Sequence, residues 1–167
     1  MINIGDHVVY NEDGVCCVEN IGVLKIATAS RDQQYYTLRP VSGDGRIYVP
    51  VDTALPLRPV MTREEAMALI YHMPEIEAEI CQLNSKRVLE EHYRNMMKSH
   101  TPEALVCTLK SIYAKRHGGE KVRALSNTDE YYRKRAEALL HQELSVALEI
   151  PVEEVEKYII HTIEAGA

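Results

Sequence analysis

The stretch IGDHVVYNEDGVCCVENI, residues 4–21, decides how the first part of this chain folds. Two apolar runs, His7–Tyr10 and the start of Val15–Ile26, lie on either side of the polar segment Asn11–Gly14. An Asp-Gly pair between two apolar runs is typical of a tight turn, because glycine readily adopts the positive φ that such a turn requires. The stretch therefore predicts two strands joined by a short turn.

The same pattern continues up to residue 60. Further apolar runs at Tyr35–Leu38 and Ile47–Val51 are separated by Ser42–Gly45, which offers two more glycines for a turn. Several short strands at close spacing predict a small barrel or a curled sheet over residues 1–60.

The last of these strands carries a signal for its position in the sheet. Pro50 cannot donate a ladder hydrogen bond, so its strand is expected either to be an edge or to end there. Alternation along the strand places Arg46 and Tyr48 on the face opposite to the apolar residues. This strand is therefore a candidate for pairing with another chain.

From about residue 61 the apolar period becomes helical, and cap residues mark where helices begin. Thr62 and Glu65 have the spacing of a capping box. Thr101-Pro102 combines an N-cap with proline at the first helical position, Ser126–Asp129 can cap another helix, and Pro151 opens the last one. These signals predict an all-α bundle of about five helices.

The segment after Pro74 is compatible with two arrangements, because proline ends the preceding helix. Ile76, Ile80 and Leu83 then have helical spacing, which would place Leu83 in the core. Asn84-Ser85 interrupts this pattern before it resumes, so one helix and two helices both remain open.

The change of period near residue 61 predicts an α+β protein with two domains. The first, residues 1–60, is expected to be the β module, and the second, residues 61–167, the helical domain. The chain has 167 residues, which is enough for two small domains.

Charge is unevenly distributed along the chain, whose formal net charge is −6. Residues 83–135 carry 12 basic and 6 acidic side chains, whereas residues 61–82 and 136–167 are acidic. A basic segment between two acidic ones is typical of a local phosphate-binding face. A solvated helical surface with scattered charges explains the same pattern without any ligand.

Motifs of catalysis are absent from the sequence. It holds no HExxH, GxSxG, Walker-type loop or GxGxxG. Its four cysteines, Cys16, Cys17, Cys81 and Cys107, form no CxxC pair and are expected to be reduced packing residues. A thiol enzyme using Cys16 or Cys17 is a minor alternative, because no basic residue flanks them to lower a pKa. We therefore expect a protein that is not an enzyme and needs no cofactor and no metal.

The hydropathy and the N-terminal sequence predict the cellular location of the protein. No apolar run approaches the length of a membrane span. The N-terminus contains Asp6 and no basic region, unlike a signal peptide. A cytoplasmic protein without membrane contact is the expectation.

Several segments together resemble the CarD/CdnL family of bacterial transcription regulators. Residues 4–21 are similar to the family's GDxVVY opening, its turn ending in Gly-Val and its V-E-x-I. Further similar segments are Tyr36–Leu38, IYVPV at 47–51, KSHTPEAL at 98–105 with Ser111–Tyr113, and LSNTDEYYRKRAEALLHQELS at 125–145. The resemblance covers nearly the whole chain, and its N-terminal module also occurs in the transcription-repair coupling factor.

The resemblance implies a transcription regulator with two partners. A Tudor-like, SH3-like β-barrel would bind the β subunit of RNA polymerase, largely by strand-edge pairing. The helical domain would contact promoter DNA at the upstream bubble edge, through backbone and minor groove without sequence specificity, and modulate open-complex stability. The protein would be a monomer, associated with the nucleoid through polymerase. The alternative is a protein–protein adaptor, bound to polymerase or another partner, with no direct DNA role.

By position, the resemblance assigns polymerase contacts to two segments. Family arginines match Leu24 and Tyr48 here, with Lys25 and Arg46 as the nearest basic residues. The expected polymerase-binding residues are Leu24, Lys25, Arg46, Ile47, Tyr48, Val49 and Pro50.

DNA contacts are expected from the basic segment of the helical half. The family's basic pair at the start of its DNA-facing helix matches Lys86 and Arg87. The full expected set is Lys86, Arg87, Arg94, Lys98, Lys115, Arg116, Lys121, Arg123, Arg133 and Lys134. The family places a Trp wedge just before the basic pair, but this chain has no Trp, and Leu83 and Asn84 occupy the matching place. Leu83 is either an apolar wedge or a core residue, and we expect the second.

Overall fold

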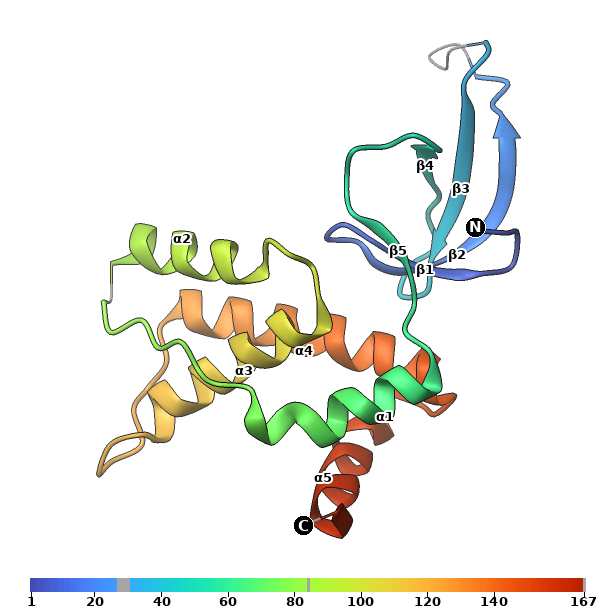
Figure 1. The fold of residues 1–167 in the computed structure, drawn as a ribbon. Helices are drawn as coiled ribbons and strands as arrows, with labels where there is room; N and C mark the ends of the chain where they lie inside the picture. Colours follow the sequence, from blue (N-terminus) through green and yellow to red (C-terminus); the bar gives the residue numbers. More distant parts are fainter. Residues whose placement is uncertain (27–30, 84, 167) are drawn as a thin grey trace. The chain divides into compact units, whose positions relative to one another are not determined.

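A computed structural model describes residues 1–26, 31–83 and 85–166 (Figure 1). The chain consists of two compact units, Met1–Met61 and Thr62–Ala167. The first unit holds the strands and the second holds the helices. The expected α+β class is therefore confirmed.

The first unit is a five-stranded antiparallel sheet with the order β4-β3-β2-β1-β5. Its strands are β1 His7–Tyr10, β2 Gly14–Val23, β3 Gln34–Pro40, β4 Ile47–Pro50 and β5 Leu57–Pro59. Within the described residues β4 and β5 are the two edges, so the sheet is open there. The expected closed, Tudor-like barrel is not confirmed. The expectation for Pro50 is confirmed, since β4 is an edge and ends at this residue.

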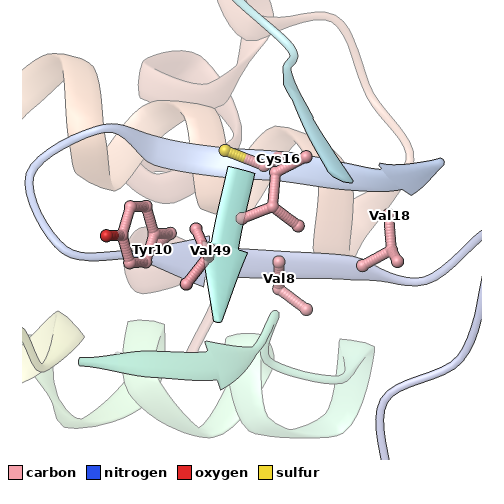
Figure 2. Packing of buried hydrophobic residues seen from close by; sticks show 6 residues of the cluster. Val8, Tyr10, Cys16, Val18 and Val49 are labelled. Carbon is pink, nitrogen blue, oxygen red and sulfur yellow. The ribbon is translucent and has the colours of Figure 1, made fainter. Parts of the chain in front are cut away.

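The β1–β2 hairpin forms where residues 4–21 predict it. Tyr10 pairs with Gly14, which has a φ of 79°. Glycine lacks a Cβ, so this conformation costs it little. The apolar side chains of the hairpin pack together with those of β3 and β4, as Figure 2 shows for Val8, Tyr10, Cys16, Val18 and Val49. This core holds the β4 edge in place.

Strand β5 is a feature that the sequence pattern does not indicate. It pairs with β1, and the pairing is extended by hydrogen bonds from Asn11 N–H to the Pro56 carbonyl (2.8 Å) and from Val60 N–H to the His7 carbonyl (3.1 Å). A three-residue strand with Arg58 at its centre is too short to show the alternation of apolar and polar residues that predicts a strand. The residues directly before the change of period near residue 61 are therefore largely part of the sheet.

The described part of the second unit contains five α-helices, as expected, and two short 3-10 turns. The helices are α1 Arg63–His72, α2 Lys86–Met97, α3 Pro102–His117, α4 Asn127–Leu148 and α5 Val155–Gly166, and the turns are Met73–Glu75 and Val152–Glu154. Pro151 precedes the second turn, and α5 itself begins only at Val155. Val155 is buried, whereas Val152 in the preceding turn is 44% exposed.

Side-chain caps begin three helices where the sequence predicts them. Thr62 Oγ1 accepts a hydrogen bond from Glu65 N–H (3.1 Å), and the Glu65 carboxylate accepts one from Thr62 N–H (2.8 Å). Ser126 and Asp129 form a second capping box, and Thr101 Oγ1 accepts from the Ala104 N–H at 3.3 Å. These bonds satisfy N–H groups that have no partner inside the helix, which is why the cap residues are reliable signals.

The helix expected through Ile76, Ile80 and Leu83 does not form, and α2 begins only at Lys86. Side chains of α3 hydrogen-bond the backbone of the segment instead. Ser111 Oγ accepts from Glu79 N–H (2.8 Å), Cys107 Sγ donates to the Glu77 carbonyl (3.2 Å), and Lys110 Nζ donates to the Met73 carbonyl (2.9 Å). Because these bonds replace those of a helix, the segment stays irregular and packs against α3.

Candidate functional site

The first candidate site is the edge strand β4. The N–H of Val51 donates to the Gln34 carbonyl (3.1 Å), which continues the β3–β4 ladder beyond Pro50. Bonded and non-bonded pairs alternate in an antiparallel ladder, so Tyr48 and Pro50 direct their backbone groups away from β3. Pro50 therefore removes no ladder bond. Within the described residues, Tyr48 offers a backbone N–H and carbonyl at an open edge, where an extended partner can pair.

The side chains around β4 alternate between core and surface. Val49 is 1% exposed and belongs to the core, whereas Tyr48 is 48% exposed on the outer face. Ile47 and Pro50 are half-buried, and Arg46, directly before the strand, is exposed. Of these expected polymerase contacts, Val49 therefore directs its side chain into the core and its backbone groups toward β3, while Tyr48 and Arg46 present their side chains to a partner.

Leu24 and Lys25 follow β2 at the end of the sheet where β4 ends. Val23 pairs with Gln34, and the next residue of β3, Tyr35, pairs with Pro50. Leu24 is half-buried and Lys25 is exposed. Arg46 precedes β4 at the other end of the ladder. The structure therefore separates the expected polymerase contacts into two groups along the sheet.

An ion-pair cluster beside the start of β4 includes two residues that sequence reasoning missed. Glu19 of β2 forms ion pairs with Arg39 in β3 and with Arg46 before β4, its carboxylate oxygens lying 2.8 Å and 2.5 Å from the two Nε atoms. The β2–β3 register shifts between Val18 and Asn20, so Glu19 lies in a β-bulge. A bulge depends on how two strands pair, and no signal in the sequence marks Glu19 or Arg39.

The second candidate site is one end of the helical unit. A core cluster of Leu89, Tyr93, Ile112, Leu125 and Tyr132 packs the beginning of α2 against the end of α3 and the beginning of α4. Figure 1 shows these three helix ends together. The exposed basic residues at or near these ends are Lys86, Arg87, Arg116, Lys121, Arg123 and Lys134. The fold therefore gathers these six residues from three segments.

The beginning of α2 has the electrostatics of an anion-binding element. Lys86 and Arg87 are exposed in its first turn, where no acidic residue occurs. Ser85 is the N-cap, but its side chain makes no capping hydrogen bond. Because a helix N-terminus already carries partial positive charge, two cations there are unfavourable without an anion. A phosphate would relieve this repulsion.

Lys115 does not belong to this basic surface, contrary to expectation. Its side chain is 8% exposed, and its Nζ lies 3.1 Å from Oδ1 of Asp129, which is 1% exposed. The same carboxylate accepts hydrogen bonds from Tyr93 Oη (2.5 Å) and Ser126 Oγ (2.8 Å). Lys115 therefore joins α3 to α2 and α4 inside the unit and is not available to DNA.

Burial and hydrogen bonding set the titration of this cluster. Burial acts to raise the pKa of Asp129, but hydrogen bonds from Tyr93, Ser126 and Lys115 outweigh it and hold the pKa below its ordinary value. Burial and the hydrogen bond to Asp129 raise the pKa of Tyr93. Asp129 is thus ionised and Tyr93 neutral near neutral pH.

The remaining expected DNA contacts lie outside the α2 N-terminus. Arg133 is largely neutralised by Glu130 (3.0 Å) and Glu137 (2.9 Å) on its own helix. Arg94 and Lys98 are exposed at the C-terminal end of α2, where cations complement the helix dipole. These three residues are less suited to phosphate binding than the six exposed basic residues described above.

Leu83 is 61% exposed, so the expectation that it is a core residue is wrong. The irregular backbone after Pro74 removes the helical period on which that expectation depended. Leu83 lies shortly before Lys86 and Arg87, which leaves the alternative of an apolar wedge. Asn84, the other wedge candidate, lies outside the described residues.

Three further features of the described residues concern metal binding, membranes and thiol reactivity. Across residues 1–26, 31–83 and 85–166 there is no group of three His, Cys, Asp or Glu residues that could hold a metal ion. In the same residues no helix is long and apolar enough to cross a bilayer. Burial, with the nearby Asp13 and Cys17, raises the pKa of Cys16 to about 11, which opposes a reactive thiolate.

Comparison with known proteins concerns the sheet unit. Residues 2–61 match the family model of the CarD-like/TRCF RID domain. No curated protein matches the chain. The match supports binding of the RNA polymerase β subunit by this unit, and it confirms the predicted resemblance for residues 2–61. Residues 2–61 of this chain are therefore similar to the CarD-like/TRCF RID domain.

Proposed function

We propose that this protein is a transcription regulator that binds the RNA polymerase β subunit through β4 and contacts promoter DNA through the basic end of its helical unit. The observation that carries the proposal is the open β4 edge within the matched domain. An extended segment of the β subunit would add to the sheet beside Tyr48. The protein acts by binding in the cytoplasm, as a monomer without catalysis or cofactor.

DNA binding would use phosphate contacts. Lys86 and Arg87 at an N-terminus without a side-chain cap, with Arg116, Lys121, Arg123 and Lys134 nearby, form a positive surface. Such contacts orient a protein on the duplex and do not read sequence. Placed by polymerase at the upstream bubble edge, this surface would modulate open-complex stability.

The polymerase contact is tested by capture of the purified β subunit on the immobilised full-length chain. We expect capture by the wild-type protein. Failure to capture the β subunit at low salt would refute this part of the proposed function.

The DNA contact is tested by titrating upstream-fork promoter DNA at several salt concentrations, with polymerase present. Replacing Lys86 and Arg87 by Ala should make the slope of log K against log salt shallower by about 2, since each lost phosphate contact contributes about 0.9. Arg94→Ala with Lys98→Ala removes the same charge at the other end of α2 and should leave the slope nearly unchanged. If the affinity for DNA depends neither on salt nor on Lys86→Ala with Arg87→Ala, the protein–protein adaptor is favoured.

Leu83 offers a test of the bubble-edge role. An exposed apolar side chain beside two cations suits insertion against a base step, but leucine covers less of a base than an indole does. Leu83→Trp should therefore lengthen the open-complex lifetime several-fold relative to wild type, whereas Leu83→Ala should shorten it. Equal lifetimes for all three proteins would exclude a wedge at this position.

A further inference from the structure

The bulge at Glu19 changes which side chains reach the outer face of the sheet. Cys16 and Val18 are buried, and after the bulge the inward position passes to Ile21, which packs against the core. Both Glu19 and Asn20 are thereby released from the core face. A regular strand would direct only one of them outward. The bulge thus aims the Glu19 carboxylate at the neighbouring strand β3.

The Glu19 carboxylate divides its two oxygens between two arginines. Oε1 forms an ion pair with Arg39, lying 2.8 Å from its Nε, and Oε2 forms an ion pair with Arg46, lying 2.5 Å from its Nε. Arg46 is held further by hydrogen bonds from its Nη1 to the carbonyls of Asp44 (3.3 Å) and Gly45 (3.5 Å). The two guanidinium groups are therefore fixed in position by one shared anion.

The arrangement leaves donors unused. Both arginines face Glu19 with Nε, and no partner among the described residues bonds the Nη atoms of Arg39 or the Nη2 of Arg46. The side chains of Arg39, Arg46 and Glu19 are 48%, 42% and 30% exposed. Two guanidiniums and one carboxylate carry a net positive charge. The free Nη groups are suited to an incoming carboxylate, which guanidinium binds with two parallel hydrogen bonds.

We propose that Arg39, Glu19 and Arg46 form a preassembled carboxylate-binding cluster, in which Glu19 is the positioning residue. Its ligand is an Asp or Glu side chain of the extended segment that adds to β4. The cluster lies beside the start of that strand, within reach of a segment paired with Tyr48. This inference rests on the proposed polymerase contact and defines the chemistry of the partner segment.

Two opposing effects decide what removal of the Glu19 charge does. Glu19→Gln makes the surface more positive, which attracts an acidic partner slightly more, but exposed charges contribute little. The same change frees two long side chains, whose ordering on binding is then unfavourable. The loss of order outweighs the gain in charge, so we expect the affinity for the β subunit to fall about 3- to 10-fold.

The experiment measures the affinity of full-length variants for the purified β subunit. Asp32→Asn is the matched control, because it removes the same charge from an exposed residue of the same unit. Arg39→Gln and Arg46→Gln should each weaken binding and reduce its salt dependence. Thermal unfolding of every variant is recorded, so that a change in fold is recognised.

A triple variant, compared with the double arginine variant, separates positioning from general structural support. If Glu19 acts by holding Arg39 and Arg46, adding Glu19→Gln to the Arg39→Gln, Arg46→Gln variant should cost no further affinity. Additive losses, or unchanged or tighter binding by Glu19→Gln alone, would overturn the inference. Capture of the β subunit by wild type would still stand in these cases. Failure of the wild type to bind would instead refute the proposed function and with it this inference.

Discussion

Each unit of this protein contains an ion cluster built from three structural elements, and the two clusters differ in burial. In the helical unit, Lys115 and Asp129 are 8% and 1% exposed. In the sheet unit, Glu19 and its two arginines are 30% to 48% exposed. A buried charge that loses its partner is costly, whereas exposed pairs contribute little to stability. The helical cluster therefore serves the fold, and the sheet cluster remains available to another molecule.

The largest expected effect is on stability and separates the two clusters directly. Asp129→Ala leaves the Lys115 ammonium buried and removes the cap of α4, so the free energy of unfolding should fall by about 3–5 kcal/mol. Glu19→Ala should lower it by at most about 1 kcal/mol. Urea unfolding of both variants provides the measurement. Similar losses would mean that the two clusters play the same role.

A second prediction is that a change in the β4 backbone affects binding of the β subunit more than stability. Tyr48→Pro removes an N–H that faces the open edge, so capture of the β subunit should weaken at least about tenfold, while the melting temperature changes little. Val51→Pro removes a ladder bond to Gln34 and should lower the melting temperature instead. The prediction fails if Tyr48→Pro binds like wild type or unfolds.

The smallest expected effect is a pH dependence confined to acidic solution. The folded-state pKa of Asp129 lies below its unfolded value of about 3.9, so its ionised form stabilises the fold above that pH. This contribution is lost as the pH falls through the folded pKa. As the pH is lowered from about 4, the free energy of unfolding of Asp129→Asn should therefore fall less than that of wild type. Parallel curves for the two proteins would contradict the assignment.

Local signals predicted much of the fold correctly. The Asp-Gly turn, the β4 edge at Pro50 and the caps at Thr62, Thr101 and Ser126 all depend on backbone groups within a few residues. Each of these features forms where the sequence places it. The errors arose where distant segments supply the partners. Ile76–Leu83 is irregular because α3 side chains bind its backbone.

The candidate sites were predicted less completely, for the same reason. Charge counts indicated a basic surface but could not show that Asp129 would enclose Lys115, because the two residues meet only when α3 packs on α4. Residues similar to a known family led to β4 and to Arg46. The resemblance could not reveal that Glu19 holds Arg46, since that contact requires the bulge and the β2–β3–β4 pairing.

The sequence by itself determined the two units, most strand and helix starts, and the relationship of residues 2–61 to the CarD-like/TRCF RID domain. Turns, caps and apolar periods determine these features because they act over one turn or one strand. Tertiary structure alone decided which charges are exposed and which are buried. That decision depends on contacts between residues distant in the chain, and it separates Arg46, open to a partner, from Lys115, enclosed in the fold.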